Sequence, residues 1–339
     1  MPRVAIQTAL YKSSKYLPVL LQSLKEQTEQ DFVLYACENS CDREEAARAQ
    51  QLLEASGIQH HLLINKDNLG FAGGHNALFR LHEAPYVMIL NDDAYLEPTH
   101  LAASLARFAA DPRCASVAGV VYRWTADPSQ RQVLEGTTLI DTMGLRYRCL
   151  ANVVDVNVGK MRQEIEKDLV QAREIFGVSG AICLYDREKA LSVSPDQLLF
   201  DPLFFMYKED VDLAIRLRRK GYTAWFDPAI VSFHRRSIKV ESNGLLGRLR
   251  EERKRPAHLR RAMYRNQFRL YVYHWSWKLG LRDIVKTKIH ACLYAGSVFA
   301  ASPRVFFGAW GEILQDLPRA FRYRRALQKM GLKKCRLYL

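Results

Sequence analysis

The chain has 339 residues, of which 48% are hydrophobic and 25% are charged. This length can bury one large core or two modest ones, and the composition is ordinary for a soluble globular protein. The sequence contains no internal repeat and no low-complexity segment. Pro2 and Arg3 lead directly into a strand pattern, so we expect no N-terminal signal peptide. The 7 cysteines form no CxxC pair, which favours a reducing, cytoplasmic compartment.

Positive charge is concentrated in the last part of the chain. The formal net charge is +14, and residues 246–339 contain 22 Lys and Arg against 5 Asp and Glu. That segment therefore carries +17, which leaves −3 for residues 1–245. A charge of this size suggests an anionic partner for the C-terminal segment only.

The first 64 residues alternate between strand and helix patterns. Residues 3–9, 31–37 and 61–64 are apolar and rich in β-branched or aromatic side chains. Residues 16–27 place their leucines on one helical face, and a second helix ends near Glu54. This alternation predicts an α/β fold with a parallel, doubly wound sheet.

Residues 87–90 form an apolar run that ends abruptly in Asn91, Asp92 and Asp93. The run predicts a buried parallel strand, and the carboxyl ends of such strands are where ligands bind. Two adjacent carboxylates repel each other, so a divalent cation or several hydrogen-bond donors should offset their charge. The alternative is an acidic turn before a helix that begins near Pro98.

A glycine-rich segment, residues 68–76, opens a helix that should run to about His82. Its three glycines permit close backbone approach to a ligand, and the helix N-terminus could face an anion. It is not a phosphate-binding P-loop, because no Gly-Lys-Ser/Thr follows. An ordinary glycine-rich turn would show the same composition.

Four segments in a fixed order carry a family resemblance: residues 8–11, 38–40, 68–74 and 90–93. Together they resemble the family 2 glycosyltransferases, inverting enzymes of the GT-A fold. The resemblance implies a Rossmann-like, mostly parallel sheet with helices on both faces. It predicts a nucleotide-sugar-binding half at 1–114, an acceptor-binding and catalytic half at 115–245, and a basic helical extension at 246–339.

The resemblance also assigns donor-binding residues. Contacts to the nucleotide sugar would come from Thr8, Ala9, Tyr11, Glu38, Asn68, Gly70, Phe71, Asn91 and Asp92. Asp93 and His234 would hold the divalent cation, Mg²⁺ or Mn²⁺, that bridges the diphosphate, with Asp92 on the ribose or the metal. A polar loop residue is the alternative for His234. The chain departs from the family at two points. The family usually has Asp where this chain has Glu38, and it usually has Asn where this chain has Tyr11 or His75.

The second half should contain the chemistry. Residues 115–121 and 178–184 are predicted strands, and 226–234 is the last strand of the core. Residues 123–171 are polar and irregular, with a helix-like stretch at 160–174, and predict an insertion beside the active site. The resemblance assigns acceptor binding to Gly180, Ala181 and Tyr207.

Residues 200–213 place an aromatic cluster before Glu209 and Asp210 at a helix N-terminus. The acids could merely cap that helix. By resemblance to the family's glutamate-aspartate motif, Asp210 is the general base and Glu209 the close alternative. A base is needed because a sugar hydroxyl is a poor nucleophile until its proton is removed. We expect a structural role for Asp212.

The basic extension mixes Arg and Lys with aromatic residues. We expect amphipathic helices on an anionic membrane surface, with Trp275, Trp277 and Trp310 as interfacial anchors. This implies a peripheral location at the cytoplasmic face of the inner membrane and no nucleic-acid partner. Nucleic-acid binding and a solvated basic face are the competing explanations.

The function expected from the resemblance is transfer of a sugar from a nucleotide-diphosphate donor, of the dTDP-rhamnose or UDP-sugar type. The acceptor would be a glycan or a lipid-linked glycan of cell-surface polysaccharide. The alternatives are a nucleotidyltransferase of related fold and a non-catalytic basic adaptor. The sequence leaves the donor, acceptor, linkage and oligomeric state open.

Overall fold

The computed structural model describes residues 1–124, 138–235 and 255–332. A ten-stranded mixed sheet forms its centre, in the order β10-β12-β6-β11-β4-β1-β2-β3, with β5 beside β12 and β7 beside β6. The strands are β1 (Val4–Leu10), β2 (Phe32–Glu38), β3 (His60–Ile64), β4 (Tyr86–Leu90), β5 (Ala94–Leu96), β6 (Cys114–Arg123), β7 (Ile140–Thr142), β10 (Arg173–Ile175), β11 (Ile182–Asp186) and β12 (Thr223–His234). Within the group β1 to β4, neighbouring strands are parallel to each other. Strands β6 and β12 form a second parallel pair. Only β11, antiparallel to β4 and β6, separates these two parallel groups.

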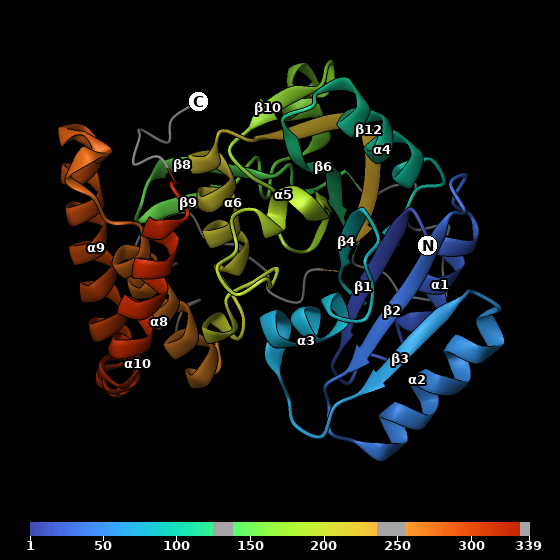
Figure 1. Ribbon diagram of the computed structural model, residues 1–339, viewed down its shortest axis with the longest axis horizontal. Coiled ribbons are helices and arrows are strands. Elements are labelled where there is room, and N and C mark those ends of the chain that lie inside the picture. The colour runs from blue at the N-terminus through green and yellow to red at the C-terminus, as the bar shows by residue number, and fades with distance from the viewer. Residues whose placement is uncertain (125–137, 236–254, 333–339) are drawn as a thin grey trace.

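Helices cover both faces of this sheet (Figure 1). Alternating residues of β4 show the two faces, because Met88 and Leu90 pack with α1 (Leu17–Lys25), α2 (Arg43–Ser56) and α4 (His100–Ala110). Val87 and Ile89 face the opposite side, with α3 (Gly70–Phe79), α5 (Arg187–Leu191) and α6 (Glu209–Lys220). The predicted α/β architecture is confirmed.

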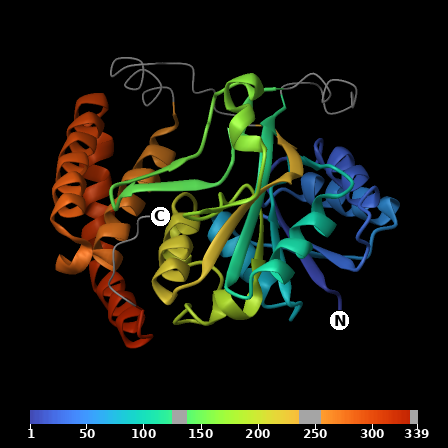
Figure 2. The same cartoon turned by 90° about the horizontal axis from the view of Figure 1, so that it is seen from above.

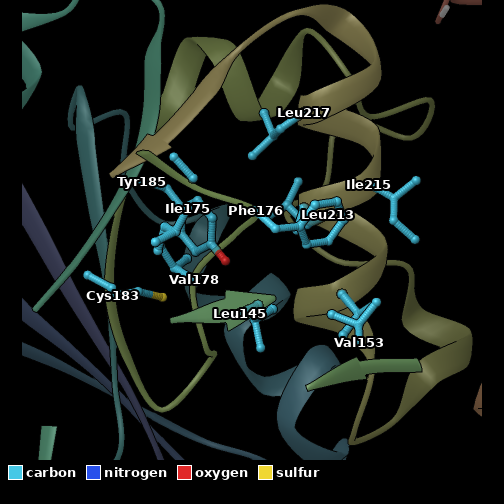
Figure 3. Packing of buried hydrophobic residues seen from close by; sticks show 14 of the residues in the cluster. Leu145, Val153, Ile175, Phe176, Val178, Cys183, Tyr185, Leu213, Ile215 and Leu217 are labelled. Atoms are coloured by element: carbon cyan, nitrogen blue, oxygen red, sulfur yellow. The ribbon is translucent and has the colours of Figure 1, made fainter. Parts of the chain in front are cut away.

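The region predicted as an irregular insertion is more ordered than its sequence suggests. It contains β7, the hairpin of β8 (Leu145–Cys149) and β9 (Asn152–Asp155), a 3-10 helix at Arg162–Leu169, and β10. The helix expected over 160–174 is shorter, a 3-10 helix at Arg162–Leu169, because residues 173–175 extend the sheet by pairing with β12. Figure 3 shows Leu145, Val153 and Phe176 in one buried cluster with Leu213 and Leu217 of α6. Residues 125–137 lie outside the described part.

The strand expected over 178–184 begins later, at Ile182. The preceding residues are used for site contacts instead of sheet pairing. The Ala181 carbonyl accepts a hydrogen bond from the Asn91 amide at 2.9 Å. The Gly180 amide donates to the Asp210 side chain at 3.1 Å.

An irregularity in β12 sets where that strand ends. Between the pairs Phe226–Ala118 and Val231–Val120, four residues of β12 oppose the single residue Gly119. The Asp227 carboxylate accepts the Ala229 amide at 2.9 Å and stabilises the bend. Beyond it β12 pairs with β5, where His234 lies opposite Ala94. This pairing brings His234 beside Asp93.

The C-terminal segment is helical, as predicted. Helices α8 (Ala257–His274), α9 (Leu281–Ala301) and α10 (Pro303–Lys329) stand together at the end of the molecule opposite α2 and β3 (Figures 1 and 2). No helix in the described ranges is long and apolar enough to cross a membrane. The boundary predicted at residues 245 and 246 lies outside the described residues.

The prediction that three tryptophans are membrane anchors is wrong for two of them, because their rings pack within the protein. Trp277 is 75% exposed, whereas Trp275 and Trp310 are half-buried. Trp275 packs against the main core, and Trp310 packs against Tyr264 and Phe268 of α8. Packing between the helices buries these rings, which a linear sequence does not reveal.

We predict that Gly119→Ala lowers the free energy of unfolding by about 3 kcal/mol, because overpacking forces backbone to move. A Cβ at residue 119 would lie 1.9 Å from the Ile230 carbonyl oxygen. Urea denaturation measures the change. The matched control is Gly296→Ala in α9, where a Cβ meets nothing within 4 Å. It should raise stability by about 0.5–1 kcal/mol. Equal stability of the two variants would contradict the close approach.

Candidate active site

The carboxyl ends of β1 and β2 present buried oxygens without protein partners. Thr8 and Glu38 are almost completely buried, and Leu10 pairs with Glu38 across the two strands. Glu38 Oε1 accepts the Ser40 amide at 2.5 Å. Thr8 Oγ1 and Glu38 Oε2 have no hydrogen-bond partner among the described residues. Buried polar atoms are normally satisfied, so both oxygens are suited to donor groups of a ligand.

The turn after β4 holds two carboxylates with different environments. Burial and the charge of the neighbouring Asp93 together raise the pKa of Asp92 to about 7, against a hydrogen bond from the Ser13 hydroxyl. Tyr11 lies beside Ser13, with its amide donating to Ser13 Oγ at 3.1 Å. The Tyr11 side chain is 54% exposed. The loop after β1 therefore meets the turn after β4.

Asp93 and His234 meet at the end of β12. His234 Nε2 lies 3.1 Å from Asp93 Oδ1 and 3.0 Å from the Asn91 side-chain amide. His234 Nδ1 lies 2.8 Å from Asp141 Oδ2. Burial alone would lower the pKa of His234, but its hydrogen bonds to Asp141 and Asp93 together raise it to about 10. Without a cation, the positive imidazolium offsets the charge of the two carboxylates, and a cation that binds Nε2 would have to displace its proton.

This arrangement fits a divalent cation with few protein ligands. Asp141 fixes the ring of His234, which is how ligating histidines are usually oriented. No group of three or more potential metal ligands occurs among the described residues. A cation here would take Asp93 and His234 and fill its remaining positions with diphosphate oxygens and water. Asp141 was missed by sequence reasoning, because it lies 93 positions from His234 in a segment without a motif.

The glycine-rich turn connects the two halves of the site. Gly70 has φ +68°, and a Cβ there would lie 2.5 Å from the Phe205 carbonyl oxygen. The Asn68 side chain accepts the Gly70 amide at 2.8 Å, and the Ala72 amide donates to the Phe205 carbonyl at 3.0 Å. Gly70 is therefore required for contact with the loop before α6. Helix α3 ends at Phe79, three residues before the predicted end.

Gly180 lies close to both Phe71 and Asp210. A Cβ on Gly180 would lie 3.5 Å from the Phe71 ring and 3.5 Å from the Asp210 Cβ. Ala9, at the end of β1, lies close to α3. A Cβ on Gly74 of that helix would lie 3.4 Å from the Ala9 Cβ. The predicted donor, acceptor and catalytic segments thus converge in three dimensions.

Glu209 and Asp210 occupy unequal positions at the start of α6. Glu209 is buried, and its Oε2 has no hydrogen-bond partner in the described structure. Burial, followed by the charge of Asp210, raises the pKa of Glu209 well above its usual value. Asp210 is only half-buried. Burial raises the pKa of Asp210 as well, against a hydrogen bond from the Gly180 amide. Asp210 is thus the more accessible carboxylate.

The loop before α6 has an unusual backbone. Phe205, Tyr207 and Lys208 have φ values of +56°, +71° and +74°. Residues other than glycine rarely adopt this left-handed backbone conformation, and the strain persists only where the surroundings enforce it. The strained loop, residues 203–208, ends directly at the two carboxylates.

Asn266 of α8 enforces this conformation. Its side-chain amide is fully buried and lies 2.8–2.9 Å from the carbonyl oxygens of Phe204, Met206 and Tyr207. Arg269 donates to the Asn266 side-chain oxygen at 2.6 Å, which fixes the amide orientation. The basic extension therefore takes part in shaping the active site, a role that sequence reasoning did not assign.

Asp212 has the structural role that we expected. It pairs with Arg216 at 2.8 Å and with His274 of α8 at 2.7 Å, and all three side chains are buried. Burial would raise the pKa of Asp212, but the Arg216 charge and the His274 hydrogen bond together lower it. This pairing fixes α6 to α8 directly behind the catalytic turn.

Residues 6–191, more than half of the chain, match the sequence pattern of glycosyl transferase family 2. The chain belongs to glycosyl transferase family 2. A search of curated proteins gives no significant match.

Two solved structures share the fold of this glycosyltransferase. One is GalNAc-T7 with UDP, GalNAc and Mn²⁺, with a TM-score of 0.61 and 10% identity, covering 95% of this chain and 58% of that chain. The other is the mannosyltransferase PcManGT from Pyrobaculum calidifontis in complex with GDP-Man and Mn²⁺. The TM-score is 0.51 and the identity 14%, and the match covers 98% of this chain and 87% of that chain. At these identities the likeness concerns the fold, and it confirms the predicted GT-A architecture.

We predict that Asn266→Ala reduces turnover by about 10²-fold, because a small displacement of a catalytic group has effects of this size. Affinity for the nucleoside diphosphate, measured by calorimetry, should stay within about twofold. The matched control is Asn152→Ala, whose amide contacts His290 outside the site at 3.4 Å. Turnover is followed as release of the nucleoside diphosphate. Equal turnover of the two variants would show that Asn266 has no influence on the catalytic loop.

Proposed function

We propose that this family member is an inverting, divalent-metal-dependent glycosyltransferase. It transfers a sugar from a nucleotide-diphosphate donor, of the dTDP-rhamnose or UDP-sugar type, to a glycan or lipid-linked acceptor of cell-surface polysaccharide. The observation that carries the proposal is the half-buried Asp210 carboxylate, which accepts the amide of Gly180 beside Phe71. The UDP, GDP-Man and Mn²⁺ of the two similar structures support a nucleotide-sugar donor and a cation.

Asp210 acts as the general base in this proposal. Its carboxylate takes the proton from the acceptor hydroxyl while that oxygen attacks the anomeric carbon. The bond from the anomeric carbon to the diphosphate breaks on the opposite side, so the configuration inverts. Burial raises the pKa of Asp210, which makes the carboxylate a stronger base than an exposed aspartate.

The donor would lie across the ends of β1, β2 and β4. Thr8 and Glu38 supply unsatisfied oxygens for the base and ribose. Asp93 and His234 would hold the cation, which supplies Lewis-acid stabilisation of the leaving diphosphate. Asp141 keeps His234 oriented for this role through Nδ1, which leaves Nε2 available for the cation.

Two rival functions are weaker. A nucleotidyltransferase of related fold does not explain the family match over residues 6–191. A non-catalytic adaptor leaves Asp93, Asp210 and His234 without a purpose. Hydrolysis of a panel of nucleotide sugars identifies the donor, and Mn²⁺-stimulated release of one nucleoside diphosphate is the expected result. Nucleotide transfer without sugar transfer would overturn the proposal.

We predict that Asp210→Asn lowers turnover by about 10²–10⁴-fold, because an amide cannot accept the proton. Donor affinity should stay nearly unchanged. In the unmodified enzyme, turnover should fall as the pH decreases through the raised pKa of Asp210, since only the ionised carboxylate acts as a base. Glu209→Gln is the matched variant. If Glu209→Gln is inactive and Asp210→Asn remains active, the base is Glu209.

We predict that Asp93→Ala abolishes Mn²⁺-dependent binding of the nucleoside diphosphate while leaving the fold intact. The lost carboxylate is the anionic ligand of the proposed pair, and His234 alone holds a cation weakly. Calorimetry with and without Mn²⁺ measures the effect, and circular dichroism checks the fold. The exposed Asp196→Ala is the control. Unchanged Mn²⁺-dependent affinity in Asp93→Ala would remove Asp93 from the metal site.

A further inference from the structure

Helix α9 has an apolar face that the described part of the protein leaves uncovered. Its inward side chains are Asp283, Ile284, Thr287 and Val298. On the opposite side, Leu281, Val285, Ile289 and Leu293 recur every fourth residue, and all are exposed. Leu293, at the middle of the helix, is 65% exposed. Figure 1 shows α9 as the outermost helix at this end of the molecule.

The apolar surface continues around the corner between α9 and α10. Phe299 and Phe307 are both exposed, and their ring centroids lie 6.1 Å apart. From residue 289 to residue 301 the sequence contains no Asp, Glu, Lys or Arg. The outer face of a terminal helix is normally charged, so an exposed surface of this kind indicates a binding site. We refer to Leu281, Val285, Ile289, Leu293, Phe299 and Phe307 as the outer apolar face.

Basic residues border the outer apolar face. Arg282 and Lys288 lie on α9 and Arg304 lies at the start of α10, and all three are exposed. This combination, apolar side chains bordered by cations, complements a lipid surface with anionic headgroups. We propose that the outer apolar face docks the protein on the surface of an anionic bilayer, with α9 lying in the interface.

Charge distinguishes lipid from the other possible occupants. A second copy of the chain would bring the same basic border against itself, and like charges disfavour that contact. Nucleic acid would need cations along the binding surface, whereas residues 289–301 offer none. The proposal replaces Trp275 and Trp310 as anchors, because both rings pack between elements of the protein.

Docking would serve the proposed function. The purpose of docking rests on that function, whereas the docking surface itself does not. An acceptor carried on a lipid is confined to the membrane, and docking at the cytoplasmic face of the inner membrane would bring the site to it. Helix α9 is connected to the site through α8, whose Asn266 holds the strained loop. Lipid binding itself is measured without a sugar acceptor.

The test is sedimentation of the full chain with two kinds of vesicles, phosphatidylcholine alone and phosphatidylcholine with phosphatidylglycerol. We expect binding to the anionic vesicles that weakens in high salt. Leu293→Glu should reduce the partition coefficient at least tenfold. The matched control, Ile64→Glu, changes an exposed apolar residue of β3 at the opposite end of the molecule and should bind normally.

Donor turnover in the absence of lipid verifies that Leu293→Glu is folded, and it should equal that of the unmodified enzyme. A failure of the donor panel together with normal vesicle binding would overturn the proposed function and leave the docking surface standing. Equal binding of Leu293→Glu and Ile64→Glu would overturn the docking surface. Two further results would overturn the docking surface. One is a protein that does not bind vesicles but forms a dimer that Leu293→Glu dissociates. The other is a protein that does not bind vesicles but is retained on RNA in a salt-sensitive manner.

Discussion

The candidate active site is built on a short segment of strained backbone that contacts from other elements hold in place. Residues 203–208 pass through the left-handed region at three non-glycine positions. The Asn266 side-chain amide and the Ala72 backbone amide both donate to carbonyl groups of this segment. Gly70 is needed because any side chain there would collide with Phe205. The glycine-rich turn and the C-terminal helices therefore meet at the same strained loop, which leads directly into Asp210.

A second constraint is the concentration of negative charge at the strand ends. Asp92, Asp93, Glu209 and Asp210 all lie near this edge of the sheet, and burial raises the pKa of three of them. His234 lies between Asp93 and Asp141 and, when protonated, offsets part of this charge. Behind the site, Asp212 is fully paired with Arg216 and His274. Carboxylates that support the fold are thus neutralised by protein partners, whereas those facing the ligand space are only partly compensated.

The C-terminal extension combines two different surfaces. Helix α8 is buried against the catalytic half, where Asn266, Arg269 and His274 contact its loops and helix α6. Helix α9 instead turns an uncharged face outward. The +17 charge of residues 246–339 is therefore a poor guide to any single role. Part of it is used inside the protein, as in the contact of Arg269 with Asp316, and part borders the proposed docking face.

The sequence by itself determined the alternation of strands and helices, because the period of apolar residues records which side of each element is buried. It also determined that the Asp92–Asp93 turn lies at a strand end and that Asp212 is structural. The tertiary structure decided what depends on contacts between distant segments. Asn266 lies 59–62 positions from the carbonyls that it holds, and Asp141 lies 93 positions from His234. The burial of Trp275 and Trp310 was decided in the same way. A hydrogen bond or a buried ring between segments so far apart leaves no periodic pattern, since each partner is placed by packing and not by its neighbours in the chain.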